Sequence, residues 1–292
     1  MNKKVFGLTA MTVVLFLVSC SKENGTEQTT SELILGKASL GMATKASLGY
    51  EDYTGDFKIN LDAVSGKYTA INGQVFSFDG GDNVWKGTTP VYLSSASTSI
   101  RAWAPTTVTA SNPVTAPNVF ALAPSLTVTN PFVYSPSYTV NATSNSVALI
   151  QLNHAYAKVT FKFTSDSSYP GAGSFSSLVL HGTPGSASID ISTNPGTVTP
   201  AADADLTYIS SATTLPTEGV AAIVVPKAAA SLTLSCTVDG TTYSNKTVSA
   251  ISALQAGKNY TITLSASGTE LFVQNVEIQQ WEDVSGGTVT LQ

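Results

Sequence analysis

Short runs of alternating apolar and polar residues recur along most of this chain. In residues 157–163 (AKVTFKF) every second side chain is apolar, and residues 231–238 and 259–264 repeat the same period of two. Such alternation is typical of strands that bury one face and expose the other. Asn-Gly and Asp-Gly pairs separate the runs at short intervals, and no long run has helical spacing. The pattern therefore predicts an all-β protein built from sandwiches of short strands.

Residues 105–146 break this alternation, because they are rich in Pro, Ser, Thr and Asn. Proline has no N–H to donate to a central ladder, so we expect loops and edge strands here rather than core. Strand-like runs on either side predict two β-sandwich domains in tandem, at residues 46–146 and 147–292, each within the usual domain size. The junction between them is expected near residues 140–150.

The first twenty residues follow a different pattern. Lys3 and Lys4 precede an apolar run, residues 5–17, that is too short to span a bilayer as a helix. The run ends in the sequence LVSC at Cys20, and this end resembles the lipobox of bacterial lipoproteins. The resemblance implies that residues 1–19 are a signal peptide and that Cys20 becomes an acylated N-terminus, which would hold the protein on a membrane. An ordinary secretory signal with a chance cysteine is the alternative.

Composition limits the classes of function. Charged residues make up only 11% of the chain, against about 25% in ordinary globular proteins, and the formal net charge is −5. Such a chain is not expected to bind nucleic acid. The only cysteine besides Cys20 is Cys236, so an acylated Cys20 leaves no partner for an intrachain disulfide. Stability is therefore expected to come from the apolar core alone.

The chain offers few groups for catalysis or metal binding. Its two histidines, His154 and His181, have no Cys or carboxylate cluster at metal-ligand spacing, and we expect His154 to support packing or a turn. No Gly-x-Ser-x-Gly segment is present. Cys236 alternates with apolar residues and is predicted to be a small core residue. Residues 79–83 (DGGDN) lack the ligand series of a calcium loop and predict a hairpin turn. We therefore expect no enzyme activity, cofactor or metal.

Five segments carry a family resemblance. Residues 153–161 (NHAYAKVTF) look like a His-Ala-x-Ala-Lys-Val-x-Phe strand, and residues 254–260 (LQAGKNY) look like a Leu-x-Ala-Gly-Lys-x-Tyr turn. Residues 276–283 (VEIQQWED) look like a near-terminal Ile-x-x-Trp-x-Asp segment, and two apolar strand ends closing on Pro, at residues 100–105 and 223–226, fit as well. In this order, beneath a lipobox, the segments resemble the fimbrillin family of Bacteroidales surface proteins, the subunits of type V pili.

This resemblance implies two transthyretin-like β-sandwich domains and a mechanism of assembly. Fimbrillins reach the outer membrane as lipoproteins, and a trypsin-like protease then removes an N-terminal strand. A strand of the neighbouring subunit fills the groove by donor-strand exchange, because the vacated edges offer unpaired N–H and C=O groups. Such a head-to-tail contact builds a filament. The expected partners are therefore other pilus subunits and the outer membrane, in a cell-surface fimbrium that supports adhesion and biofilm formation.

The matching parts lie at both ends of the chain. Within the expected tether, residues 20–45, the apolar run Leu33, Ile34 and Leu35 is the candidate removable strand. Both Lys37 and Lys45 begin a copy of the sequence KASLG, and we favour Lys45 as the processing site because small residues precede it. The alternative is a solvated linker. Many fimbrillins are cut after Arg, whereas the only Arg here lies inside the first domain, so an uncut subunit stays an alternative.

The last residues are the candidate donor strand. After two glycines come Thr288, Val289, Thr290 and Leu291, with both apolar side chains on one face. The alternative is that this strand pairs within its own sheet. Shaft and anchor roles stay open.

A different class of function is also open, namely a monomeric lipid-anchored surface protein that binds glycans or another host or bacterial surface ligand. In that case the aromatic residues Trp85, Trp103, Tyr50 and Tyr53 would stack on sugars, although such residues in sandwiches are usually core.

Overall fold

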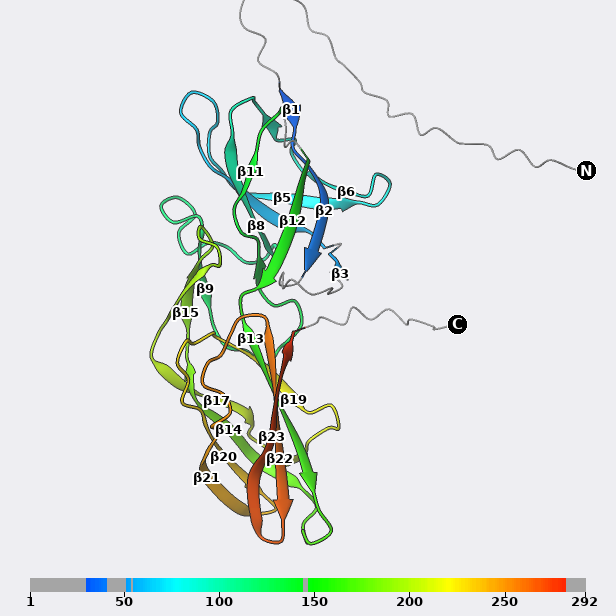
Figure 1. The fold of residues 1–292 in the computed structure, drawn as a ribbon, viewed down its shortest axis with the longest axis vertical. Helices are drawn as coiled ribbons and strands as arrows, with labels where there is room; N and C mark the ends of the chain where they lie inside the picture. The colour runs from blue at the N-terminus through cyan, green and yellow to red at the C-terminus, as the bar shows by residue number, and fades with distance from the viewer. Residues whose placement is uncertain (1–29, 41–50, 54, 144–146, 282–292) are drawn as a thin grey trace, which may run out of the picture.

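The computed structural model describes residues 30–40, 51–53, 55–143 and 147–281. Within these residues every regular element is a strand, so the predicted all-β class is confirmed. The described strands form five sheets, which lie in two main groups along the long axis of the molecule (Figure 1). Among the described residues there is no apolar helix of the length that crossing a membrane would need.

The first group is a sheet that closes on itself, here called the N-terminal ring. Val133 in β10 lies opposite His154 of β12 on one side and opposite Ala104 of β8 on the other. The order β10-β12-β2-β6-β5-β4-β8 therefore forms a closed circuit, with β3 added to β2 and β11 added to β8. The strands are β2 (Ile34–Leu40), β3 (Glu51–Asp52), β4 (Phe57–Leu61), β5 (Ile71–Asp79), β6 (Val84–Gly87), β8 (Thr98–Ala104), β10 (Val133–Tyr134), β11 (Tyr138–Val140) and β12 (Val147–His154).

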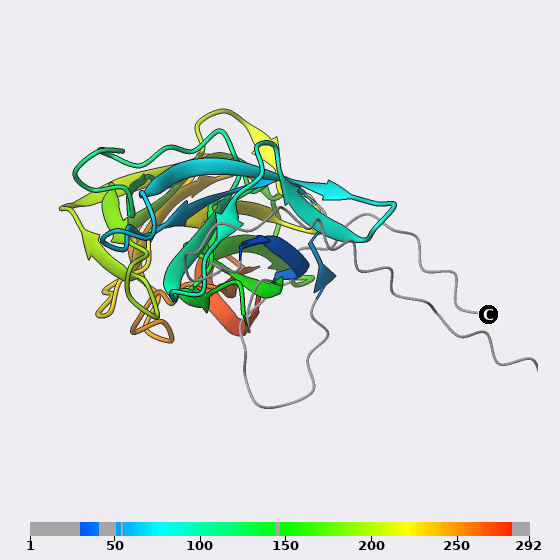
Figure 2. The same ribbon diagram turned by 90° about the horizontal axis from the view of Figure 1, so that it is seen from above.

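A buried apolar cluster fills the ring. Alternation places Phe57, Ile59 and Leu61 of β4 inside, where Phe76 of β5 stacks on Phe57 with 6.2 Å between ring centroids. A short separate pair, β1 (Ser31–Glu32) with β7 (Tyr92–Leu93), lies next to the start of β2. In the view from above (Figure 2), β2, in blue, lies beside the green β12.

The second group, here called the C-terminal sandwich, consists of two facing sheets. One has the order β19-β13-β22-β23 and the other the order β17-β14-β20-β21, with β18 added to β14. The bounds are β13 (Ala157–Ser165), β14 (Ser174–Pro184), β17 (Asp203–Ile209), β18 (Thr213–Thr214), β19 (Val220–Val224), β20 (Thr233–Val238), β21 (Thr241–Thr247), β22 (Lys258–Ser267) and β23 (Glu270–Gln280).

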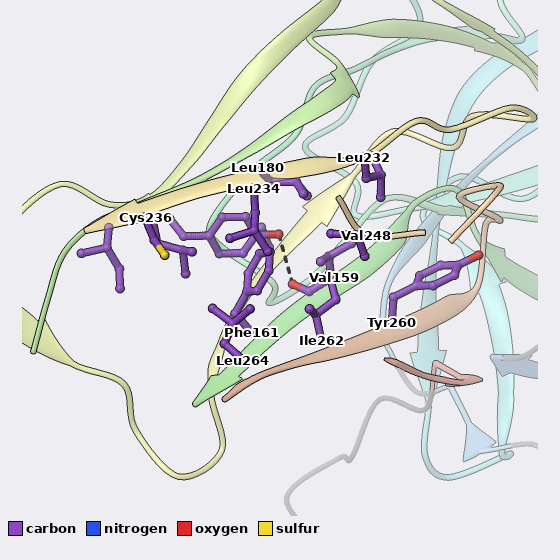
Figure 3. Close-up of a cluster of buried hydrophobic side chains, with 14 of the residues drawn as sticks. Val159, Phe161, Leu180, Leu232, Leu234, Cys236, Val248, Tyr260, Ile262 and Leu264 are labelled. Atoms are coloured by element: carbon purple, nitrogen blue, oxygen red, sulfur yellow. Dashed lines mark hydrogen bonds between the residues drawn. The ribbon is translucent and has the colours of Figure 1, made fainter. Parts of the chain in front are cut away.

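The sandwich core is the region that the period-two runs predict best. Phe161 of β13 and Leu264 of β22 face Leu234 and Cys236 of β20 across the core (Figure 3). The Tyr208 hydroxyl donates a hydrogen bond to the Val159 carbonyl oxygen at 3.2 Å, which satisfies a polar group inside this cluster.

The predicted turn between β20 and β21 is present. Asp239 and Gly240 have φ values of 47° and 81°, and two successive positive φ angles are what a tight hairpin of this kind requires.

A three-stranded sheet joins the two groups. β9 (Val119–Leu122) comes from the proline-rich segment of the first half, and it pairs with β15 (Ala187–Asp190), which pairs in turn with β16 (Thr197–Pro200). β9 is an edge strand, as expected, but Phe120 and Leu122 are fully buried beside Trp103 and Ile223. The expectation that this segment lies outside the core was therefore wrong, because proline restricts the backbone only at its own position and leaves the side chains between prolines free to pack.

Sheet pairing changes over between β12 and β13. β12 pairs with β2 and β10 in the ring, whereas β13 pairs with β19 and β22 in the sandwich. By this pairing residues 147–154 go with the first half, and residues 31–40 of the expected tether do so as well. The two-domain division at residues 46–146 and 147–292 stays a prediction.

Candidate assembly groove

The strand β2 belongs to the ring, and it precedes in the sequence every ring strand with which it pairs. It lies between β12 and β6, pairing in parallel with β12 from Ile34 opposite Val147 to Leu40 opposite Leu152. Leu35 lies opposite Trp85 of β6 on the other side. Two more backbone bonds hold the strand, from Leu33 N–H to the Val91 oxygen at 2.8 Å and from Tyr53 N–H to the Ala38 oxygen at 3.0 Å.

Three side chains of β2 and of the residue just before it belong to the core of the ring. Leu33, directly before β2, and Leu35 and Ala38 within it are all fully buried. Leu33 and Leu35 are two positions apart, whereas Leu35 and Ala38 are three positions apart, so the plain alternation of a strand is interrupted between Leu35 and Ala38. The interruption is a bulge, because Leu35 lies opposite Ala148 and Lys37 opposite Leu149, which leaves Gly36 as the extra residue. The bulge lets both halves of the strand bury their apolar side chains.

The walls around these side chains are also apolar. Trp85, Leu93, Ile150 and Leu152 belong to the same buried cluster. Each leucine buried in such a site contributes about 1.5–3 kcal/mol relative to exposure. We call the space that β2 fills, between β12 and β6, the assembly groove.

The predicted site residues fall into two groups. The predicted removable strand Leu33, Ile34 and Leu35 lies in this groove, and the strand continues to Leu40. Lys37 lies inside the paired part of β2, opposite Leu149. The lipidation site Cys20 and the favoured processing site Lys45 lie outside the described residues. So does the predicted donor strand, residues 288–291.

Sequence reasoning missed the second half of β2. The first copy of KASLG looked like a flexible linker because its residues are small, and Gly36 just before it hid the continuation of the apolar pattern. The alternation of Ala38 with Leu40 was the available signal.

At the lower end of the groove, where β12 meets the sandwich, two aromatic side chains stack. His154, the last residue of β12, lies flat against Trp281, which follows β23 directly, with 4.1 Å between ring centroids and 6° between planes. The ammonium of Lys158 lies 5.8 Å from the centroid of the same indole. Burial, with a smaller effect of the Lys158 charge, lowers the pKa of His154 to about 4, so the imidazole is neutral at pH 7. The predicted packing role of His154 is confirmed.

Comparison with known proteins identifies the family. Residues 42–281 match a family model described as fimbrillin-like. The chain belongs to the fimbrillin-like family.

Solved structures share the fold of this fimbrillin-like chain. A candidate cell adhesion protein from Bacteroides ovatus is 14% identical with a TM-score of 0.59, covering 85% of this chain and 96% of that one. One from Bacteroides uniformis is 18% identical with a TM-score of 0.55, covering 86% and 99%. A fimbrial protein from Bacteroides vulgatus is 11% identical with a TM-score of 0.51, covering 86% and 100%. No curated protein matches.

A Ser-His-Asp arrangement on the fimbrillin-like sandwich was not foreseen. His181 Nδ1 lies 2.6 Å from Asp205 Oδ1, and His181 Nε2 lies 2.9 Å from Ser235 Oγ. The three residues stand on β14, β17 and β20, neighbouring strands of one sheet. Asp205 is 67% exposed, so water screens its charge. Ser235 Oγ also accepts a hydrogen bond from Asn245 N–H at 3.1 Å, which ties β21 into the same network. The arrangement therefore links four strands.

The other chemically suggestive residues have structural roles. Cys236 is 1% exposed, and burial raises the pKa of its thiol to about 12. Residues 79–83 form the predicted hairpin turn between β5 and β6. Lys86 donates to both carboxylates of that turn, Asp79 and Asp82, and so occupies the place that a cation would take. Asp79 Oδ1 also accepts from the Gly81 N–H at 3.0 Å.

Two of the four aromatic residues considered for sugar stacking are core residues. Trp85 is 3% exposed and donates its indole N–H to the Gly55 oxygen at 3.1 Å, and Trp103 is 2% exposed and donates to the Val108 oxygen at 3.1 Å. Tyr53 is half-buried, and Tyr50 lies outside the described residues. The prediction of a core role is confirmed for both tryptophans.

Proposed function

We propose that this fimbrillin-like chain is a pilus subunit, shaft or anchor, that polymerises by exchanging the strand β2 for a strand of a neighbouring subunit. The observation that carries the proposal is the position of β2 within the ring. Leu33, directly before β2, and Leu35 and Ala38 within it are fully buried, yet β2 precedes in the sequence every strand with which it pairs in the ring. Removal of β2 would leave β12 and β6 with unpaired edges on either side of an apolar groove.

The position of the lysines supports cleavage after Lys45. Residues 41–50 join β2 to β3, so a cut after Lys45 separates the whole of β1 and β2 from the ring. A cut after Lys37 would break a paired strand and would leave residues 38–40 attached. Proteases need an extended, unpaired segment, and the backbone of Lys37 is part of the ladder with β12.

Cleavage would also detach the subunit from the membrane. An acylated Cys20 stands on the same side of Lys45 as β2, so the lipid would leave with the removed strand. This arrangement fits an outer-membrane lipoprotein that is released into a fimbrium serving adhesion and biofilm formation. An uncut chain would keep its lipid and would suit an anchor.

The tail supplies a matching donor. Val289 and Leu291 are separated by one residue, like Leu33 and Leu35 in β2. A donor strand with this spacing would place two apolar side chains in the two leucine sites of the groove, and its backbone would restore the ladders with β12 and β6.

The test mixes two forms of the protein so that each has one role. The acceptor is a chain cut after Lys45 that lacks residues 282–292, and the donor is an uncut Lys45→Ala chain with an intact tail. The proposal predicts a one-to-one complex on a sizing column, with release of the fragment that contains β2. A donor carrying Leu291→Asp should not form it, whereas the matched donor Thr290→Asp, changed on the opposite face, should. If no donor forms a complex, exchange is disproved and a monomeric surface-binding protein is the better description.

A further inference from the structure

We infer that a subunit cut after Lys45 closes its vacated groove with its own residues 282–292, and that this self-closed monomer has to open before the subunit can polymerise. The inference rests on the proposed function, because it requires that β2 leave the ring. It adds a regulated state, in which the donor tail of a subunit first acts within the same molecule.

The starting point of the tail carries the inference. Trp281 is the last described residue, and its indole stacks on His154 at 4.1 Å. His154 follows Leu152 by two residues in β12, and Leu152 lies opposite Leu40, the last residue of β2. The tail therefore begins at the lower end of the groove of its own subunit. Figure 1 shows the upper end of β23 just below the lower ends of β2 and β12.

The tail is long enough to fill this groove. From His154 to Val147, where pairing with β2 begins, β12 spans seven residue steps, which correspond to about 23 Å at about 3.3 Å for each step. Residues 282–291 reach about 33 Å when extended. The tail would run upward and hence antiparallel to β12 and parallel to β6, whereas β2 runs parallel to β12 and antiparallel to β6. The reversal therefore exchanges the two kinds of pairing and leaves one of each.

The register of such a ladder agrees with the observed anchor point. If Gly286 takes the place of Ala38 opposite Ile150, counting along an antiparallel ladder puts Trp281 opposite Ala155. Trp281 is in fact stacked on His154, one residue away. The register therefore agrees with the observed position of Trp281 to within one residue.

The side chains fit in the same register. Reading from the residue before β2 along the strand, the buried positions are Leu33, Leu35 and Ala38, with spacings of two and three. Reading the tail backwards from Leu291, the same spacings give Leu291, Val289 and Gly286. Two apolar residues thus meet the leucine sites, and a glycine meets the site of the small alanine. Gly287 next to it gives the backbone freedom that the bulge at Gly36 requires.

Mass action favours the internal strand. A tethered segment of this length acts at an effective concentration in the millimolar range, whereas the tail of a neighbour acts at the concentration of the free subunit. The first strand to replace β2 is then the subunit's own, and a neighbour can enter only when this strand leaves.

The experiment follows the loss of β2 after cleavage. A non-acylated mature chain is labelled with a thiol-reactive dye, which reacts at Cys20 because Cys236 is buried and its thiol pKa is about 12. After the cut at Lys45, we expect the labelled fragment 20–45 to leave at a rate that is unchanged over a dilution of about 100-fold, and the product to be a monomer by sedimentation. The double variant Val289→Asp/Leu291→Asp should slow release by about tenfold or more, since each buried apolar side chain is worth about that factor.

A matched variant and an added peptide separate the outcomes. Thr288→Asp/Thr290→Asp changes the opposite face and should release the fragment at the normal rate. Release in proportion to protein concentration, polymeric products, or equal release from the Val289→Asp/Leu291→Asp variant would each overturn the inference and leave the proposed function standing. If an excess of synthetic peptide 282–292 also fails to release the fragment, the groove does not accept this tail, and the proposed function falls with the inference.

Discussion

The ring and the sandwich each contain a parallel pair of strands, and the two pairs are built differently. In the sandwich, β13 and β22 pair without interruption over eight residues, from Lys158 opposite Asn259 to Ser165 opposite Ala266. In the ring, β2 pairs with β12 over six residues and has a bulge at Gly36. Both β13 and β2 bury apolar side chains completely.

The difference lies in how the chain enters and leaves each strand. β13 is joined to β12 of the ring at one end and to β14 of the sandwich at the other, whereas β2 is preceded only by β1 and is joined to the rest of the ring through residues 41–50. One cut there turns a central strand into a separate ligand, and no single cut of that kind exists for β13. Under the proposed function, the sandwich is therefore a permanent core, and the ring is a core with one replaceable strand.

The largest expected effect is in the permanent core. Phe161→Ala removes a fully buried ring that packs edge-on against Tyr208 with 4.8 Å between centroids. We expect the free energy of unfolding of the sandwich to fall by about 3–5 kcal/mol, and no added strand peptide should restore it. Denaturant unfolding followed by circular dichroism measures the change. The control Phe272→Ala, at a ring that is 43% exposed, should stay within about 0.5 kcal/mol of the parent.

The matching change in the ring is Leu35→Ala, which should lower the free energy of unfolding by about 2–5 kcal/mol. Unlike the loss at Phe161, this loss should be recovered in a chain cut after Lys45 when a peptide of residues 31–40 with the parental leucine is added. Thermal unfolding with and without the peptide gives the answer. A chain that the peptide does not stabilise would show that β2 is not separable from the ring.

The junction between the halves should respond to acid. Because burial lowers the pKa of His154 from 6.5 to about 4, the folded protein resists the protonation that the unfolded chain accepts. The stability from the neutral imidazole is complete above pH 6.5 and is lost as the pH falls towards 4, by up to about 3 kcal/mol at 1.36 kcal/mol for each pKa unit. Urea unfolding at several pH values measures this slope. The variant His154→Phe keeps an aromatic side chain against Trp281 but has no titrating group there. Its loss of unfolding free energy between pH 6.5 and pH 4 should therefore be smaller than that of the parent by about 3 kcal/mol.

The smallest expected effect concerns the Ser-His-Asp arrangement. His181→Ala should cost about 0–1 kcal/mol, because the partner Asp205 is largely exposed and water replaces the lost hydrogen bonds. The variant should not change the exchange of β2, which lies in the other half. A loss of several kcal/mol in denaturant unfolding would mean that the network holds the sheet more strongly than its exposure suggests.

The period-two pattern predicted the sandwich well. The runs at residues 157–163, 231–238 and 259–264 correspond to β13, β20 and β22, and their apolar faces form its core. In these strands the local pattern and the burial in the fold agree, because each strand has one face in the core and one face in solvent.

Features that depend on pairing between distant segments were not predictable in this way. His181 meets Asp205 and Ser235, which are 24 and 54 residues away in sequence, only because β14 pairs with β17 and β20 in a particular register. The length of β2 was hidden for a related reason. The bulge at Gly36 shifts the inward face by one residue, so the alternation looks broken in the sequence although it is restored against β12.

The short strand β9 gives the molecule a mechanical property. Four residues of β9 lie opposite four residues of β15, so a segment of the first half is hydrogen-bonded alongside a segment of the second. Both strands run roughly along the long axis in Figure 1. A pull along that axis would therefore load all the hydrogen bonds between β9 and β15 together in shear, rather than breaking them one after another. In a filament of such molecules, tension would be shared between the β9–β15 pair and the connection from β12 to β13. The region between the ring and the sandwich would then stretch little until the β9–β15 bonds broke.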